Sequence, residues 1–91
     1  MSEHQVEVEV EEIEVKVVYN GVIKEITVRP EETVRQLLDR AIQAFSPIPQ
    51  PHLLALFPPE GLELNESLTV REAGIHDETK LLLRPSAVKG G

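Results

Sequence analysis

The stretch Val18-Tyr19-Asn20-Gly21-Val22-Ile23 places an Asn-Gly pair between two runs that are rich in β-branched residues. Asn-Gly in this setting is the strongest short-range signal for a β-hairpin, because a two-residue turn of the primed type needs positive φ at both central positions. Such a turn also fixes the register of the strands, since the numbers of paired residues must then add up to 41. The sequence therefore predicts both the hairpin and its side-chain pairing.

That register gives the hairpin one mostly apolar face and one face with pairs of opposite charge, so cross-strand contacts favour it on both sides. The mostly apolar face joins Tyr19 to Val22, Val17 to Lys24, Val15 to Ile26 and Ile13 to Val28, and the charged pairs are Lys16–Glu25 and Glu12–Arg29. We therefore expect the first strand to begin near Glu12.

Residues 1–11 are predicted to form an acidic N-terminal extension. Residues 1–14 contain six of the sixteen acidic residues and none of the nine Lys and Arg residues. The valines at positions 6, 8 and 10 alternate in one phase, whereas Ile13, Val15 and Val17 alternate in the other. This slip of phase separates the extension from the first strand, because side chains of one strand alternate between two faces without interruption.

A helix is predicted after Pro30, which ends the second strand. Thr33 followed three residues later by Gln36 is the pattern of a capping box, in which each residue bonds the other's backbone N–H. Six apolar residues then recur at helical spacing and form one stripe: Val34, Leu37, Leu38, Ala41, Ile42 and Phe45. The prolines at positions 47, 49 and 51 end this helix.

The second half of the chain contains shorter predicted elements. Residues 52–57 form an almost entirely apolar strand, so alternation does not show which of its side chains face the core. Residues 62–64 are predicted to be a short edge strand, Thr69 to cap a single helical turn that ends at Gly74, and residues 80–83 to be the last strand.

Composition narrows the classes of function. A net charge of −7 and only three aromatic residues argue against nucleic acid as a partner, because phosphates attract positive charge and bases stack on aromatic rings. The chain has no Cys and no apolar run of membrane-spanning length, and its first residues lack the basic start of a secretory signal. We expect a monomeric cytoplasmic protein without a membrane partner.

Neither a catalytic nor a metal-binding residue is predicted. The sequence offers no candidate for a catalytic nucleophile, because it has no Cys, no serine at a strand-to-helix elbow and no spaced set of His and carboxylate residues. His4, His52 and His76 lie too far apart in the sequence for a metal-binding spacing. We therefore expect a protein that is not an enzyme and has no cofactor of its own.

The order of these elements, followed by Gly90-Gly91, resembles that of ubiquitin and the ubiquitin-like modifiers, which have the β-grasp fold. The resembling residues are Tyr19-Asn20-Gly21, the helix entry at 29–34, Ile48-Pro49, Ser67-Leu68-Thr69 through Ala73-Gly74-Ile75, and Leu81-Leu82-Leu83. The resemblance implies an α+β fold whose mixed sheet packs on one helix, with the last strand between the first and the third. It also implies a ubiquitin-like domain at residues 12–84 and a flexible diglycine tail at residues 85–91.

In that family an activating enzyme uses ATP to adenylate the terminal glycine carboxylate, which is passed on as an activated ester and joined to a lysine of a target. The resemblance makes Gly91 the reacting residue and Gly90 its neighbour, in a tail that contains Arg84, Pro85, Ala87 and Lys89. Ala87 stands where ubiquitin has Arg, so the eukaryotic ubiquitin-activating enzyme is not the expected partner. Such divergence with intact ends is similar to the ubiquitin-like proteins of bacterial operons.

The partners that the resemblance implies are activating and conjugating enzymes, a deconjugating protease and target proteins. Their expected binding patch lies on the open face of the sheet, at Val18, Ile23, Ala55 and Leu82. For self-conjugation, Lys16 and Lys24 are expected to be more exposed than Lys80 and Lys89. Two alternatives stay open: a sulfur carrier with a C-terminal thiocarboxylate, and a docking module in which the glycines are incidental.

Overall fold

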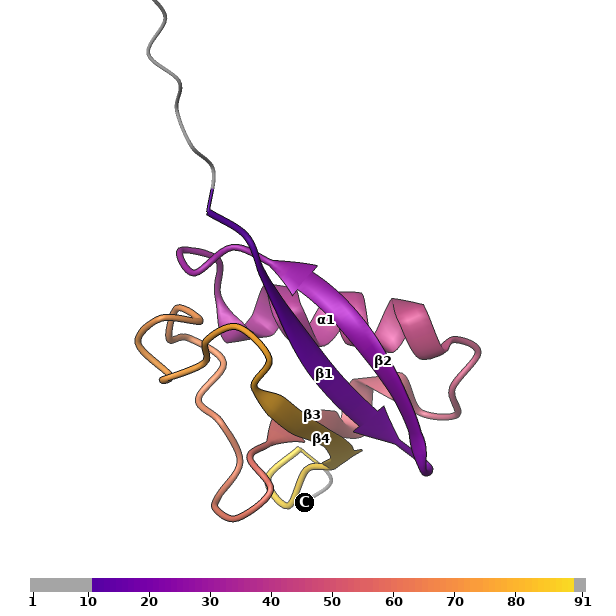
Figure 1. Cartoon of the computed structure of the whole chain (residues 1–91). Helices are drawn as coiled ribbons and strands as arrows, with labels where there is room; N and C mark the ends of the chain where they lie inside the picture. The colour runs from indigo at the N-terminus through magenta and orange to yellow at the C-terminus, as the bar shows by residue number, and fades with distance from the viewer. Residues whose placement is uncertain (1–10, 90–91) are drawn as a thin grey trace, which may run out of the picture.

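The computed structural model describes residues 11–89 of the 91-residue chain. Its elements are β1 (Ile13–Tyr19), β2 (Val22–Val28), α1 (Val34–Phe45), the short 3-10 helix η1 (Pro51–Leu53), β3 (Leu54–Phe57) and β4 (Lys80–Pro85). The four strands form one sheet, and α1 lies across one of its faces (Figure 1). This arrangement confirms the predicted α+β fold with a mixed sheet packed on one helix.

The β1–β2 hairpin has the predicted register over its whole length. Seven pairs run from Ile13 with Val28 to Tyr19 with Val22, and the numbers in each pair add up to 41. Asn20 has a φ of 53° and Gly21 a φ of 80°, the positive values that a turn of the primed type requires. β1 begins at Ile13, directly after the predicted start.

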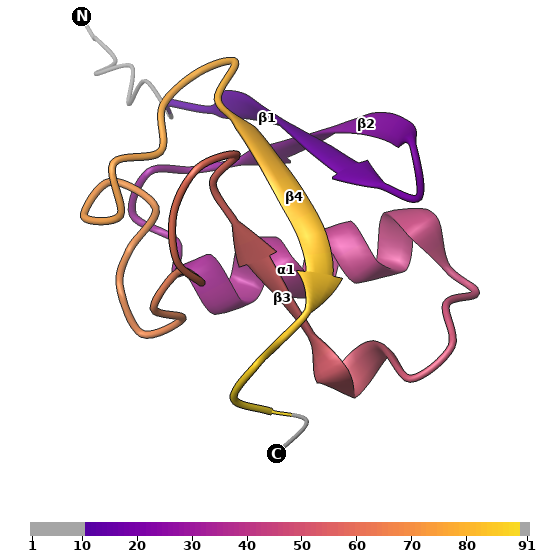
Figure 2. The same ribbon diagram turned by 90° about the horizontal axis from the view of Figure 1, so that it is seen from below.

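The strand order is β2-β1-β4-β3, so the last strand lies between the first and the third. β4 runs parallel to β1 and antiparallel to β3. β1 pairs with β4 as far as Leu82 and β3 pairs with it as far as Pro85, so the chain that follows β4 leaves from a central strand of the sheet (Figure 2).

The core lies between α1 and the sheet. The predicted capping box is present, since the Thr33 side chain accepts from the N–H of Gln36 and the Gln36 side chain accepts from the N–H of Thr33. The stripe that follows it is buried on Val34, Leu37, Leu38 and Ala41, and the facing strands contribute Val15, Val17, Ile26, Leu81 and Leu83. Each large side chain of this kind contributes about 1.5–3 kcal/mol when buried. No helix within residues 11–89 is both long and apolar enough to cross a lipid bilayer.

Three predicted elements differ from the structure. Residues 62–64 are not a strand, because only one backbone hydrogen bond, from Leu64 to Leu56, ties them to β3. The strand expected to begin at residue 52 begins at Leu54, after η1. The Thr69 hydroxyl accepts the N–H of Glu72, as expected for the predicted cap, and Gly74 is left-handed with a φ of 80°. The turn between them is too short to form a regular helix.

Candidate functional site

The tail differs from the flexible segment that we expected from Pro85 onwards. Pro85 is the last residue of β4 and pairs with Leu54 of β3. The N–H of Ser86 then donates to the carbonyl of Leu53 over 2.7 Å, so the antiparallel pairing continues for one more residue. Gly90-Gly91, the predicted reacting pair, lies outside the described residues.

Ser86 organises the described part of the tail. It is the only buried polar residue within residues 11–89, and its hydroxyl donates to the carboxylate of Glu63, with 2.8 and 2.9 Å to the two oxygens. The same Oγ accepts the N–H groups of Val88 and Lys89, each over 3.0 Å. A hydroxyl that accepts from the residues two and three positions on closes a tight local turn. The chain therefore bends back at Ala87.

The bend returns Lys89 to the body of the protein. Its Nζ donates to the carbonyl of Leu54 over 2.8 Å and forms an ion pair with Glu66. Ala87 and Val88 are exposed. The sequence assigned Lys89 and Ala87 to the tail but did not predict these contacts, because the positions of Glu63 and Glu66 depend on how the loop after β3 folds.

A second candidate surface lies on the face of the sheet that α1 does not cover. Val18 pairs with Ile23 in the β1–β2 ladder and with Leu82 in the β1–β4 ladder. Leu82 pairs in turn with Phe57 of β3. Ile23 is 56% exposed and the other three side chains are partly exposed. These four residues cross all four strands and are called the apolar row below.

Ala55, which we predicted for this patch, is fully buried although it lies on the open face. It pairs with Arg84, whose guanidinium carbon lies 5.3 Å from the ring centre of Phe57, two residues further along β3. The methyl group of Ala55 is therefore covered by longer neighbours. Phe57 occupies the place predicted for Ala55, and the sequence did not reveal it because residues 52–57 lack alternation.

The two lysines favoured as acceptors have amines that are already engaged. Lys16 is half-buried whereas Lys80 is exposed, so the expected order of exposure is wrong for this pair. The Nζ of Lys16 lies 3.1 Å from Glu78, and the hydrogen bond and charge of Glu78 raise the pKa of Lys16. Lys24 is exposed, but its Nζ donates to the carbonyl of Ala44 over 2.8 Å. Either amine must leave its partner before it can act as a nucleophile.

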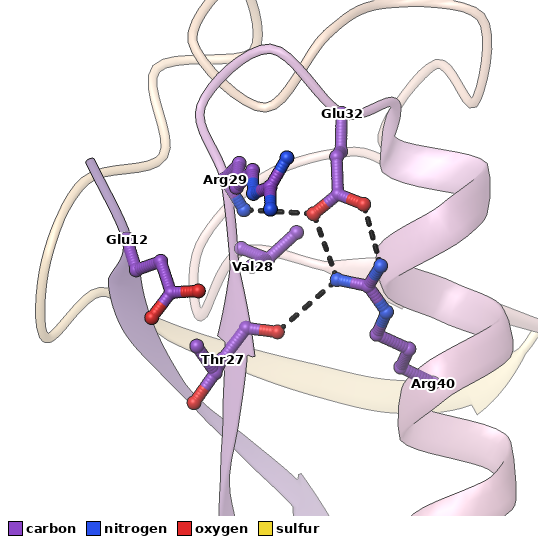
Figure 3. Close-up of a pocket in the computed structure, with 6 residues that line it drawn as sticks. All are labelled: Glu12, Thr27, Val28, Arg29, Glu32 and Arg40. Atoms are coloured by element: carbon purple, nitrogen blue, oxygen red, sulfur yellow. Dashed lines mark hydrogen bonds and ion pairs between the residues drawn. The ribbon is translucent and has the colours of Figure 1, made fainter. Parts of the chain in front are cut away.

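A hollow of about 330 Å³ lies between the end of β2 and α1, and two charged residues of its lining, Glu32 and Arg40, pair with each other (Figure 3). Arg40 of α1 donates to both carboxylate oxygens of Glu32 and to the carbonyl of Thr27. The hydrogen bonds from Arg40, and then the one from the N–H of Arg29, lower the pKa of Glu32. These contacts fasten the helix to the end of the hairpin, so we assign the hollow a structural role.

Three exposed carboxylates, two on the β1–β2 hairpin and one in the turn before β4, meet at one point, where the sequence predicted no metal site. Oxygens of Glu14, Glu25 and Glu78 lie within 4.8 Å of one another. A hydrogen bond with Glu25 and the negative charges around it raise the pKa of Glu14. Lys16 supplies a positive charge beside Glu78. Such an exposed cluster balanced by a lysine is common on protein surfaces, and we assign no ion to it.

The sequence and the fold each have known relatives. Residues 8–91 match the model of a family described as Protein of Unknown function (DUF2604). No curated protein matches the chain.

Similar solved structures include the NMR structure of the ubiquitin-like domain of an Arabidopsis thaliana protein, which is 22% identical with a TM-score of 0.71, over 97% of this chain and 92% of that one. A protein designed on the basis of ubiquitin is 23% identical with a TM-score of 0.72, over 88% of this chain and 95% of that one. ATBAG1, solved in complex with HSP70, is 18% identical with a TM-score of 0.71 over 86% of this chain. The match spans only 42% of the ATBAG1 chain. These likenesses show that the chain has the ubiquitin-like β-grasp fold.

Proposed function

The chain belongs to the DUF2604 family of proteins of unknown function, and we propose that it is a ubiquitin-like protein modifier. In this proposal an activating enzyme adenylates the carboxylate of Gly91, in the form of the protein that ends at this residue. Conjugating enzymes then join Gly91 to an amine of a target protein through an isopeptide bond. The observation that carries the proposal is the position of Gly90-Gly91, a few residues beyond the central strand of a ubiquitin-like fold.

The chemistry explains why this position matters. A carboxylate is a poor acyl donor until its oxygen becomes a good leaving group, and a mixed anhydride with AMP provides one. The enzyme must place the carboxylate next to the α-phosphate of ATP, which requires a backbone that enters a narrow site without a clash. Gly90-Gly91 meets this requirement, because neither residue carries a side chain. The partner enzyme supplies the ATP site and the catalytic groups, and the ubiquitin-like domain is the part of this chain that the enzyme binds.

The apolar row supports recognition by partner proteins. An apolar strip across the open face of a small domain is favourable when a partner covers it. We propose that the activating and conjugating enzymes bind here, as does a deconjugating protease, with Arg84 beside Phe57 at the β3 end of the row. We place the reaction in the cytoplasm, the compartment that suits an acidic chain without cysteine.

The proposal is tested by the exchange of pyrophosphate into ATP. An activating enzyme isolated on the immobilised chain should catalyse this exchange when the chain is added, because adenylation of Gly91 releases pyrophosphate reversibly. Gly91→Asp should abolish the exchange, and Glu60→Gln, a change at an exposed loop position, should leave it intact. Exchange at the same rate with Gly91→Asp would show that Gly91 is not the residue adenylated.

The apolar row also favours one second candidate, a docking module that is never conjugated. In that case the open face binds a partner and Gly90-Gly91 has no role. A chain that lacks residues 90–91 would then retain all of its partner binding and its activity in cells.

A further inference from the structure

Residues 86–89 form a hook that closes back onto the protein after β4 (Figure 1). Two carboxylates of the loop that follows β3, those of Glu63 and Glu66, hold this hook. Both contacts involve partly buried groups, and both lie close to the residues through which the tail must reach an enzyme. The hook therefore bears directly on how Gly90-Gly91 can react.

The first contact fixes the turn itself. The hydroxyl of Ser86 has one proton to donate, which goes to Glu63, and it accepts the N–H groups of Val88 and Lys89. The carboxylate of Glu63 orients the hydroxyl so that its oxygen faces these two N–H groups. Loss of Glu63 would leave the hydroxyl free to rotate and would weaken both bonds of the turn.

The second contact fixes the end of the hook. The side chain of Lys89 is 26% exposed and that of Glu66 is 19% exposed, so water and salt screen this ion pair less than a pair on the open surface. The Nζ of Lys89 also donates to the carbonyl of Leu54, and Arg35 places its guanidinium 3.6 Å from Glu66. Lys89 therefore occupies a site formed by a carbonyl of β3 and a carboxylate that α1 holds in place.

The closed hook limits the reach of the reacting end. In the form of the protein that ends at Gly91, two residues lie beyond Lys89, and two residues span at most about 7 Å. Once the hook is open, the six residues after Pro85 span about 20 Å in an extended form. A narrow enzyme site accepts an extended backbone, and the turn at Ser86 is not extended.

We propose that the hook is a latch that keeps the tail in a resting form, and that the activating enzyme must open it before Gly91 can be adenylated. The contacts stand by themselves, whereas this consequence for the reaction rests on the proposed function. Ser86, Glu63, Glu66 and Lys89 are positioning residues in this scheme, since none of them touches the reacting carboxylate. If the enzyme presents a carboxylate to Lys89, the ion pair between Lys89 and Glu66 is replaced by one between Lys89 and the enzyme as the tail enters.

The latch is tested by hydrogen exchange of single amides in the intact protein, followed by NMR. The amides of Val88 and Lys89 should exchange about tenfold more slowly than in a free peptide of residues 84–91, the factor expected for a modest hydrogen bond. Ser86→Ala and Glu63→Ala should remove this protection, whereas Leu81 and Leu83 in β4 should keep theirs, which shows that the fold is intact. Glu60→Gln removes the same charge at an exposed loop position and should leave the exchange rates of all four amides unchanged. Exchange of Val88 and Lys89 at the peptide rate in the unaltered protein would overturn the latch.

The functional consequence is tested by pyrophosphate exchange with the activating enzyme. Glu66→Gln weakens the latch and leaves the tail itself unaltered, so it should increase the exchange rate at low chain concentration several-fold over that of Glu60→Gln. Equal rates for these two variants would show that the latch does not control activation. If the amides are protected but Gly91 is never adenylated, the proposed function fails and the latch stands.

Discussion

Phe57 of β3 and Leu82 of β4 are direct partners on the open face of the sheet, where the sequence had placed Ala55 as a surface residue. Their neighbours in the sheet extend this contact through Val18 to Ile23, so an apolar strip runs from one edge strand to the other. The strip joins a pair from the hairpin, Val18 and Ile23, to Leu82 and Phe57 from later parts of the chain, and these meet only because β4 enters between β1 and β3.

The apolar row is expected to bind partner enzymes, and Leu82→Arg tests this. The substitution places a charge on the open face and should leave the melting temperature within a few degrees, because the side chain is already partly exposed. Binding to the immobilised activating enzyme should weaken at least tenfold, as for the loss of a central interface residue. Leu62→Arg is the control, since Leu62 is 88% exposed outside the row. Unchanged binding of a protein with both Leu82→Arg and Phe57→Arg would place the docking surface elsewhere.

The pairing of Glu32 with Arg40 should stabilise the fold in a pH-dependent way. The pKa of Glu32 is lowered in the folded protein, so its contribution is present above the ordinary value of about 4.5 and is lost as the pH falls through the lower folded value. Glu32→Gln should cost about 1.5–3 kcal/mol at pH 7, the range for hydrogen bonds to charged groups. Urea unfolding at pH 7 and at pH 2.5 should show this difference shrinking in acid. A difference that is equal at both pH values would contradict the role of the ionised carboxylate.

Leu37 tests the helix stripe, because it is fully buried between α1 and the sheet. Leu37→Ala should cost about 2–5 kcal/mol of unfolding free energy, through lost burial and the cavity that it leaves. Leu62→Ala removes the same atoms at an exposed position and should change the stability by less than about 0.5 kcal/mol. Equal effects of the two substitutions in urea unfolding would contradict this core.

Removal of residues 1–10 should leave the melting temperature nearly unchanged. β1 begins at Ile13, and the core side chains of the described part of the chain lie between residues 13 and 83. Calorimetry of the shortened chain checks this expectation. A fall of more than about 5 °C would correspond to roughly 1 kcal/mol and would mean that the valines of the extension take part in the fold.

Local signals were sufficient for the parts of the fold that depend on neighbours in the chain. Asn20-Gly21 determined the hairpin and its register, because a two-residue turn allows only one pairing. Thr33 and Gln36 marked the start of α1, because a capping box is formed by residues three positions apart. The order of the strands came from the resemblance to ubiquitin rather than from the residues alone.

The remaining features depend on contacts between distant segments. Phe57 could not be assigned to a face, since every residue around it is apolar and alternation is the only local signal for a face. The contacts of Ser86 and Lys89 depend on two glutamates more than twenty residues earlier, in a loop without regular structure. Residues 62–64 show the opposite error, in which a strand-like pattern was not matched by a partner strand.

The most direct test of the account is the chemical bond that Gly91 forms. The protein is incubated with its activating enzyme, ATP and lysate, and the higher-mass products are digested and analysed by mass spectrometry. The account predicts peptides in which the Gly91 carbonyl forms an amide with a lysine of another protein, and none of these with Gly91→Asp. A C-terminal thiocarboxylate on Gly91 without any amide to a target would contradict the modifier and identify a sulfur carrier.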